Sequence, residues 1–154
     1  MSRPAWGVCL LMVLLLSACV GRTRYHHYLS LPREGWARQD TVLFQLPDSM
    51  PGGRMQVAVE LRATRSFPYT DLWIALEQRD SMQRVLHNDT LHISMTDAQG
   101  NLSGHGQGLL EYTSVAIPFV ADSLGSCHEV RLRHLMSQEV IPSLTDIGLQ
   151  VTCP

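Results

Sequence analysis

The histidines and acidic residues of this 154-residue chain could supply metal ligands or acid–base groups, but their spacing matches no known arrangement. His128 and His134 are six residues apart in a strand-like segment, about 20 Å if extended, so one metal ion cannot bind both. Only the fold could bring the adjacent His26 and His27 close to His105. Acidic residues fall at the ends of expected strands, where solvated charges are ordinary: Asp71, Glu77, Asp80 and Asp97. We therefore predict no catalytic residue, no metal site and no cofactor.

The glycine-rich stretch GNLSGHGQG, residues 100–108, has the composition of a phosphate-binding loop without its chemistry. It contains no lysine and no helical pattern follows it, so we expect its glycines to form a turn and to allow close strand packing. All 12 basic side chains of the chain are arginine. The absence of lysine excludes Schiff-base catalysis and pyridoxal attachment.

Cys19 has the sequence context of a lipid-modified cysteine. Residues 5–16 form an apolar run after a single charge at Arg3, long enough for a signal-peptide core and too short to span a bilayer. The sequence Leu-Ser-Ala-Cys at residues 16–19 resembles the lipobox of bacterial lipoproteins, in which the cysteine receives a diacylglyceryl thioether and the chain is cut before it. We predict a signal peptide at residues 1–18 and a lipid anchor at Cys19, rather than a stray thiol after an ordinary secretion signal. Two or three acyl chains hold a protein on a membrane durably.

The residues after Cys19 and the net charge indicate a location. No aspartate and no acidic cluster follows Cys19, which favours the outer membrane with the protein facing the periplasm. Removal of residues 1–18 takes Arg3 with it, and the formal charge of −2 becomes about −3. The chain thus lacks the basic surface of a nucleic-acid-binding protein. We expect the membrane and envelope proteins as partners, with no nucleic acid and no small-molecule substrate.

Cys127 and Cys153 are the thiols that remain after the signal peptide is removed and Cys19 is acylated. In an oxidising periplasm such a pair is a candidate disulfide, worth about 2 to 4 kcal/mol. A hairpin of residues 129–135 with residues 147–152 would bring the two cysteines together. Its register would point them to opposite faces unless a bulge intervened, so the sequence leaves the bond open.

Alternating apolar and polar residues dominate the chain after residue 40. Val57, Val59, Leu61 and Ala63 alternate with polar residues, and Leu72, Ile74 and Leu76 do the same around an outward-facing Trp73. Turn signals rich in Pro, Gly, Asp and Ser separate these runs. We predict an all-β fold, an antiparallel β-sandwich of seven or eight strands over residues 41–154, with a helical turn near residues 138–144.

Residues 19–40 are predicted to form a lipidated arm. The stretch is too aromatic for a free tether, with Tyr25, Tyr28 and Trp36 among its residues. We expect the arm to lie on the domain, and Trp73 is a candidate for the residue against which it packs.

Short motifs in order along the chain resemble those of a known family. They are the lipobox, then "Y..Y..LP..GW", "D.V.F", "PYTDLWIALE", "DTL.....D..GN..G.G.G" and "DIGLQV". Together they resemble the gliding-motility lipoproteins called GldH, from about residue 25 to residue 151. The resemblance implies an outer-membrane lipoprotein that is needed for gliding and associated with envelope machinery that also serves protein secretion. It implies no reaction and no ligand. Two features depart from the family pattern, the absence of lysine and the pair of cysteines at residues 127 and 153.

The sequence thus predicts a non-enzymatic, lipid-anchored component of the gliding-motility and associated secretion machinery. The alternative is a glycan-binding envelope lipoprotein, which would need exposed aromatic side chains. The candidates for such a partner or glycan surface are Trp36, Tyr69, Trp73 and Tyr112.

Five Asp-Ser/Thr-apolar triplets resemble the acceptor pattern for O-glycosylation in envelope proteins of gliding-type bacteria, and they are equally ordinary turn sequences. They begin at Asp40, Asp48, Asp80, Asp89 and Asp122.

Overall fold

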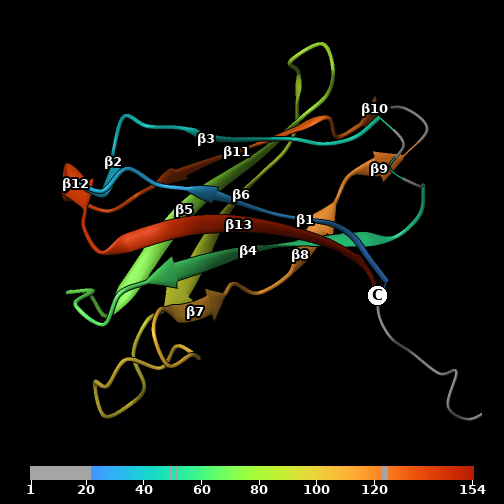
Figure 1. Cartoon of the computed structure of the whole chain (residues 1–154). Coiled ribbons are helices and arrows are strands. Elements are labelled where there is room, and N and C mark those ends of the chain that lie inside the picture. Colours follow the sequence, from blue (N-terminus) through green and yellow to red (C-terminus); the bar gives the residue numbers. More distant parts are fainter. Residues whose placement is uncertain (1–21, 49, 51, 123–124) are drawn as a thin grey trace, which may run out of the picture.

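A computed structural model describes residues 22–48, 50, 52–122 and 125–154 (Figure 1). In these residues the chain is all-β, with antiparallel pairing throughout the two main sheets. The strands are β1 (Arg22–Ser30), β2 (Trp36–Ala37), β3 (Val42–Gln45), β4 (Met55–Ala63), β5 (Asp71–Arg79), β6 (Val85–Ser94), β7 (Leu110–Thr113), β8 (Ile117–Phe119), β9 (Ala121–Asp122), β10 (Gly125–Ser126), β11 (Glu129–His134), β12 (Val140–Ile141) and β13 (Leu144–Cys153).

Two sheets form the sandwich. The first has the order β1-β13-β4-β7, with β8 also paired to β4, and the second has the order β3-β11-β5-β6 (Figure 1). Strands β7 and β8 pair with the two ends of β4 and so occupy one position in the first sheet. The two sheets of the described chain therefore offer eight strand positions, and the predicted antiparallel β-sandwich is confirmed.

The alternating pattern places the core as predicted. Val57, Val59 and Leu61 of β4 and Leu72, Ile74 and Leu76 of β5 each have 0% of their surface exposed. These side chains belong to one cluster that both sheets supply. Because successive side chains of a strand point to opposite faces, the polar residues between them point mostly outward.

Residues 22–30 differ from the predicted arm. They form β1, which pairs with β13 from Arg22 opposite Cys153 to Ser30 opposite Asp146, and is therefore an edge strand of the first sheet. A register shift between Thr23 and Tyr25 interrupts the alternation that would have revealed the strand. Trp36, farther along the predicted arm, lies in β2 and is fully buried.

Two further local expectations were wrong. Residues 138–144 form no helical turn, because Val140 and Ile141 make strand β12, which pairs with β2. The turn that follows includes Ser143 in a left-handed conformation, with φ of 67°. The hairpin expected from residues 129–135 and 147–152 does not form either, because β11 pairs with β3 and β5, whereas β13 pairs with β1 and β4.

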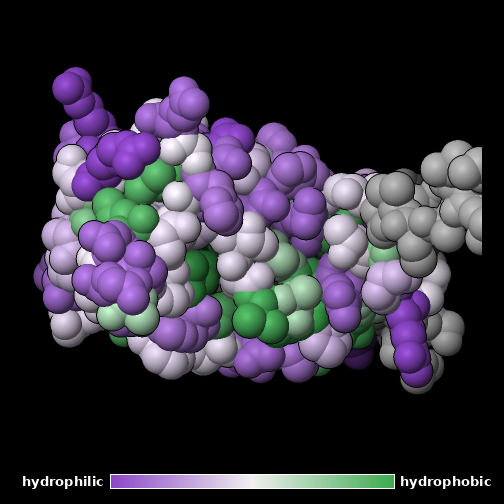
Figure 2. Space-filling view, turned by 90° about the horizontal axis from the view of Figure 1, so that it is seen from below, coloured by the Kyte–Doolittle hydropathy of each residue, from purple (hydrophilic) through white to green (hydrophobic). Residues whose placement is uncertain are grey.

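The outer surface mixes polar and apolar groups. On the face shown in Figure 2, hydrophobic groups lie in patches between hydrophilic side chains. Trp73 and Leu135 are exposed large apolar residues that come from adjacent strand segments of the second sheet, where the Leu135 N–H donates to the Trp73 carbonyl. This pair marks one end of the outward face of the second sheet.

Candidate functional site

The four aromatic residues predicted as a binding surface do not share one surface. Trp36 and Tyr112 lie in the core with 0% and 6% of their surface exposed, and Tyr69 is half-buried. Only Trp73 is well exposed, at 44%. The predicted row of exposed aromatics is therefore not formed, because β2 and β7 direct Trp36 and Tyr112 into the core cluster.

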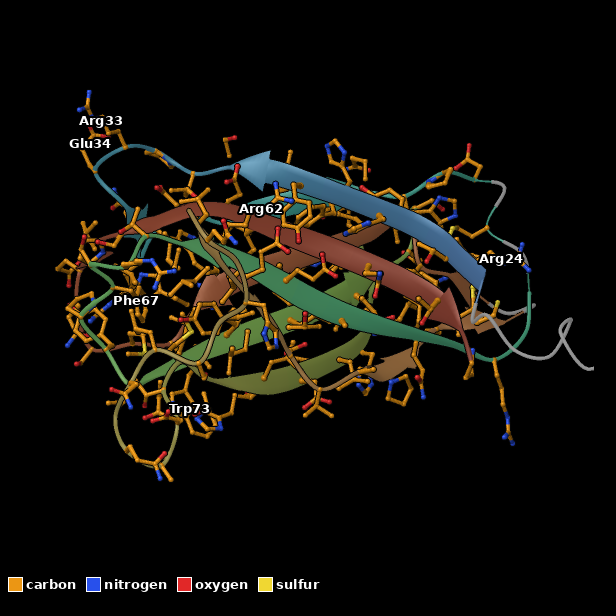
Figure 3. The ribbon with its side chains drawn as sticks, turned by 60° about the horizontal axis from the view of Figure 1, so that its bottom comes forward. Arg24, Arg33, Glu34, Arg62, Phe67 and Trp73 are labelled. Atoms are coloured by element: carbon orange, nitrogen blue, oxygen red, sulfur yellow. The ribbon has the colours of Figure 1, made fainter. Side chains whose placement is uncertain are left out.

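Trp73 stands on the outward face of β5, as its place in the alternation predicts (Figure 3). Its ring stacks on His92 of β6, with centroids 4.4 Å apart and planes at 27°. The Nε2 atom of His92 lies 2.6 Å from Oδ1 of Asp71, and hydrogen bonds from Thr70 and His92 lower the pKa of Asp71. Residues 22–30 do not cover Trp73, since they form β1 of the other sheet. Trp73 is thus oriented by its neighbours and still open to solvent.

Charged side chains continue the same outward face beyond Trp73. The β5–β11 register sets them in cross-strand pairs: Ala75 with Arg133, Glu77 with Arg131, and Arg79 with Glu129. Within each strand an acid accepts from the Nε of an arginine two residues away, Glu77 from Arg79 and Glu129 from Arg131. These bonds engage the inner nitrogen of each guanidinium.

Glu129 is the buried member of this set, with 4% of its surface exposed. Burial acts to raise its pKa, but hydrogen bonds from Arg131 and Gln45 outweigh that effect and lower the pKa. Glu129 is therefore a fixed negative charge beneath the arginines. Within the described part of the chain, Arg133 makes no salt bridge and donates no side-chain hydrogen bond.

The outward face is hollowed where its smallest side chain lies. Ala75 forms part of a concavity of about 260 Å³, which we call the Ala75 hollow. Its lining residues come from β5, β6, β11 and the residue before β3: Thr41, Ala75, Glu77, Arg79, Asn88, Arg131 and Arg133. Three arginines and two neutral polar side chains thus meet at one place with a single acid.

Cys127 and Cys153 are both free thiols in the structure, so the candidate disulfide is not formed there. Cys127 lies beside β11 of the second sheet and donates to the Glu129 carbonyl over 3.3 Å, whereas Cys153 ends β13 of the first sheet. Sγ of Cys153 accepts from Nε of Arg24 over 3.4 Å. The sequence left this bond open, and the hairpin that would have brought the two cysteines together does not form, because its two strands belong to different sheets.

Two of the candidate acids hold local structure. Asp80 accepts from the backbone N–H groups of Met82 and Arg84, and Asp97 accepts in the same way from Gln99 and Asn101. Both carboxylates close turns between strands. Over the described ranges, no group of three His, Cys, Asp or Glu side chains lies close enough to hold a metal ion.

The glycine-rich stretch serves close packing, as expected. A Cβ at Gly104 would lie 2.5 Å from the Tyr112 ring, so Tyr112 packs directly on the backbone there. Gly106 has a φ of 127°, and a Cβ there would lie 2.3 Å from the Leu109 carbonyl oxygen. The loop is built around its glycines and contains no anion-binding helix.

A polar cluster that the sequence did not reveal fastens β1 to the first sheet. The Tyr28 hydroxyl donates to Oε2 of Glu60 over 2.5 Å, and Nε2 of His26 lies 2.7 Å from the same oxygen. The Arg62 guanidinium lies 4.0 Å from the centroid of the Tyr28 ring, beside β1 in Figure 3. We call Tyr28, Glu60, Arg62 and His26 the Tyr28 cluster. It reaches from β1 across β13 to β4.

Gly148 makes this reach possible. It stands opposite both Tyr28 and Glu60 in the register of β13, so the Tyr28 ring crosses above it. A Cβ at Gly148 would lie 2.7 to 2.9 Å from three ring atoms of Tyr28. Burial, followed by the hydrogen bond to Glu60, raises the pKa of Tyr28, so its hydroxyl remains a donor at neutral pH.

Some predicted sites lie outside the described residues. These are the signal peptide, Cys19, and two glycosylation candidates, Ser49 and Ser123. Of the other candidate acceptors, Thr41, Ser81 and Thr90 are exposed. The described part of the chain contains no helix with the length and apolarity to cross a membrane.

The amino-acid sequence matches a protein family and a curated protein. A family model described as "GldH lipoprotein" matches residues 23–151. A curated relative, the gliding motility lipoprotein GldH of Flavobacterium johnsoniae, is 28% identical over 102 residues. The match covers 65% of this chain and 62% of the relative's length. The matched residues include the Tyr28 cluster and nearly all of both sheets, from the second residue of β1 to Val151 of β13.

Proposed function

Because the chain belongs to the GldH lipoprotein family, we propose that it is a lipid-anchored, non-enzymatic component of a gliding-motility machinery and of the secretion system associated with it. The anchor is Cys19, and the domain faces the periplasm from the outer membrane. Its partners are other envelope proteins of the machinery. Its role is to hold a binding surface at the membrane, where a sheet face or edge engages such a partner.

The observation that carries this proposal is the short distance between the anchor and the fold. Cys19 lies three residues before Arg22, where β1 begins. Three fully extended residues span at most about 11 Å. A domain tethered in this way stays within about 11 Å of its acyl chains, at the end where β1 begins and β13 ends. That end is marked by the C-terminus in Figure 1.

The way that β1 is held supports a mechanical role. Any pull between the lipid and the domain passes through β1, which pairs with β13 along its length. The Tyr28 cluster adds a side-chain connection from β1 to β4, the strand beyond β13. A lipoprotein with a long flexible linker would need no such connection.

The environment of the acidic residues favours a non-enzymatic role. Asp80 and Asp97 close turns, while Glu60 and Asp71 pair with histidines. These interactions hold the fold together without a catalytic task.

A complementation experiment tests the anchoring. In a host that lacks its own copy, the wild-type protein should restore motility, whereas a secreted version with Cys19→Ala should fold and fail to restore it. Ser17→Thr, a conservative change in the lipobox, serves as the matched control and should retain function. Full motility with the unlipidated protein would refute the anchoring argument.

Crosslinking in intact cells tests the partner. A tagged protein that keeps its lipobox should capture motility or secretion proteins of the envelope. The unlipidated version should lose them. Capture of the same abundant porins by both versions would contradict the proposed role.

A further inference from the structure

We propose that the outward face of the second sheet binds an acidic oligosaccharide, with a sugar ring on Trp73 and a carboxylate in the Ala75 hollow. This goes beyond the proposed anchoring function and does not depend on it. The face combines a solvent-open aromatic ring with a polar, arginine-lined concavity on the same strand.

The first reason is a set of exposed polar side chains that have no hydrogen-bond partner among the described residues. Arg133, Asn88 and Thr41 line the hollow, and none of them donates a side-chain hydrogen bond within the described structure. Binding sites for small polar ligands are concave and contain a few convergent polar groups of this kind. A ligand rich in hydroxyl and carboxylate oxygens would satisfy all three.

The balance of charge selects an acidic ligand. Arg79 and Arg131 are each paired to a glutamate through Nε, and one terminal nitrogen of each also donates to Gln83, so these two arginines add positive charge beside the hollow rather than free donors. Arg133 has no acidic partner in the described residues. A planar guanidinium binds a carboxylate through two parallel hydrogen bonds. The three arginines outnumber Glu77 and Glu129, so one negative charge on the ligand would balance the site.

The exposed Trp73 ring and the small volume of the hollow favour a sugar as the ligand. Trp73 precedes Ala75 by two residues on the same face of β5, so ring and hollow are immediate neighbours. His92 stacks on Trp73 and is fixed by Asp71, which holds the indole in place. An indole face covers the apolar C–H side of a sugar ring well, because it gives a large contact area at little entropic cost. A volume of about 260 Å³ lies just below the usual range for a whole-ligand pocket, so the hollow suits the carboxylate end of a sugar whose ring lies on Trp73.

A binding titration with the full domain tests the proposal. The probes are tetragalacturonate and a hyaluronan tetrasaccharide, compared with methyl-esterified tetragalacturonate, which keeps the sugar rings and removes the charge. We expect binding of the acidic probes at up to about 1 mM and at least tenfold weaker binding of the ester. Arg133→Gln and Trp73→Ala should each weaken binding of the acidic probes at least tenfold. Thermal unfolding checks that both variants fold, since both side chains are exposed.

The control variant is Arg24→Gln, which removes an exposed arginine on β1 in the other sheet and should leave binding unchanged (Figure 3). Equal binding of the ester, or binding that survives Arg133→Gln, would overturn the proposal. A hexaglutamate peptide separates a sugar site from a general acidic site. Binding of that peptide in place of the acidic sugars, or no binding of either sugar at about 10 mM, would overturn it as well.

Discussion

Replacement of Gly148 by alanine should detach the Tyr28 ring and so weaken the attachment of β1 to the first sheet. The new Cβ would lie 2.7 to 2.9 Å from the ring, closer than packed atoms tolerate, so the ring must turn away. The backbone of β13 at Gly148 is ordinary strand, so alanine itself fits there. The effect therefore acts through Tyr28.

The expected loss follows from the contacts of that ring. A hydrogen bond to a charged acceptor contributes about 1.5 to 3 kcal/mol, and the Tyr28 hydroxyl bond to Glu60 is of this kind. The Arg62 contact with the ring, at 4.0 Å, adds about 0.5 to 1 kcal/mol at an exposed site. Gly148→Ala should thus lower the free energy of unfolding by about 2 to 4 kcal/mol.

Urea unfolding of the unlipidated domain measures this loss, and a double-mutant cycle tests its cause. In a Tyr28→Ala background the clash is absent, so Gly148→Ala should cost less than about 0.5 kcal/mol. Tyr28→Phe, which removes the hydroxyl alone, should cost about 1.5 to 3 kcal/mol. If Gly148→Ala costs the same with and without Tyr28, the reasoning is refuted.

Three other predictions address buried groups. Burial, followed by the positive charge of Arg38, lowers the pKa of His134 below its usual 6.5, so the unfolded chain binds a proton more readily than the folded chain. The free energy of unfolding, measured with urea, should therefore fall as the pH drops below about 6.5. His134→Phe should make this pH dependence weaker. Asp80→Ala should lower the free energy of unfolding by about 2 to 4 kcal/mol, and Asp97→Ala should lower it less, because the Asp80 carboxylate is buried and the Asp97 carboxylate is exposed. An equal loss of stability in the two variants would contradict this prediction. In the native protein, iodoacetamide should label Cys153 well before Cys127, because burial raises the pKa of Cys127 to about 11. Mass spectrometry follows the labelling, and a result with neither cysteine labelled would indicate a disulfide.

The alternating pattern was sufficient to predict which side chains point inward along the long strands. Leu72, Ile74 and Leu76 are buried and Trp73 is exposed because the two-residue period of a strand is a local property. The same period, repeated between turn signals, was enough to predict an antiparallel sandwich. The lipobox context of Cys19 is also local, so the predicted anchor needs no tertiary information.

Which strands pair could not be predicted from the local pattern and became clear from the fold. Tyr28 and Glu60 are 32 residues apart, and their contact depends on the joint register of β1, β13 and β4. The charged face around Arg133 likewise exists because β11 lies beside β5 rather than beside β13. Pairing between distant segments is set by packing and register across the whole sheet, which no local pattern encodes. For this reason the sequence misassigned the N-terminal strand, left the cysteine pair open and did not reveal the Ala75 hollow.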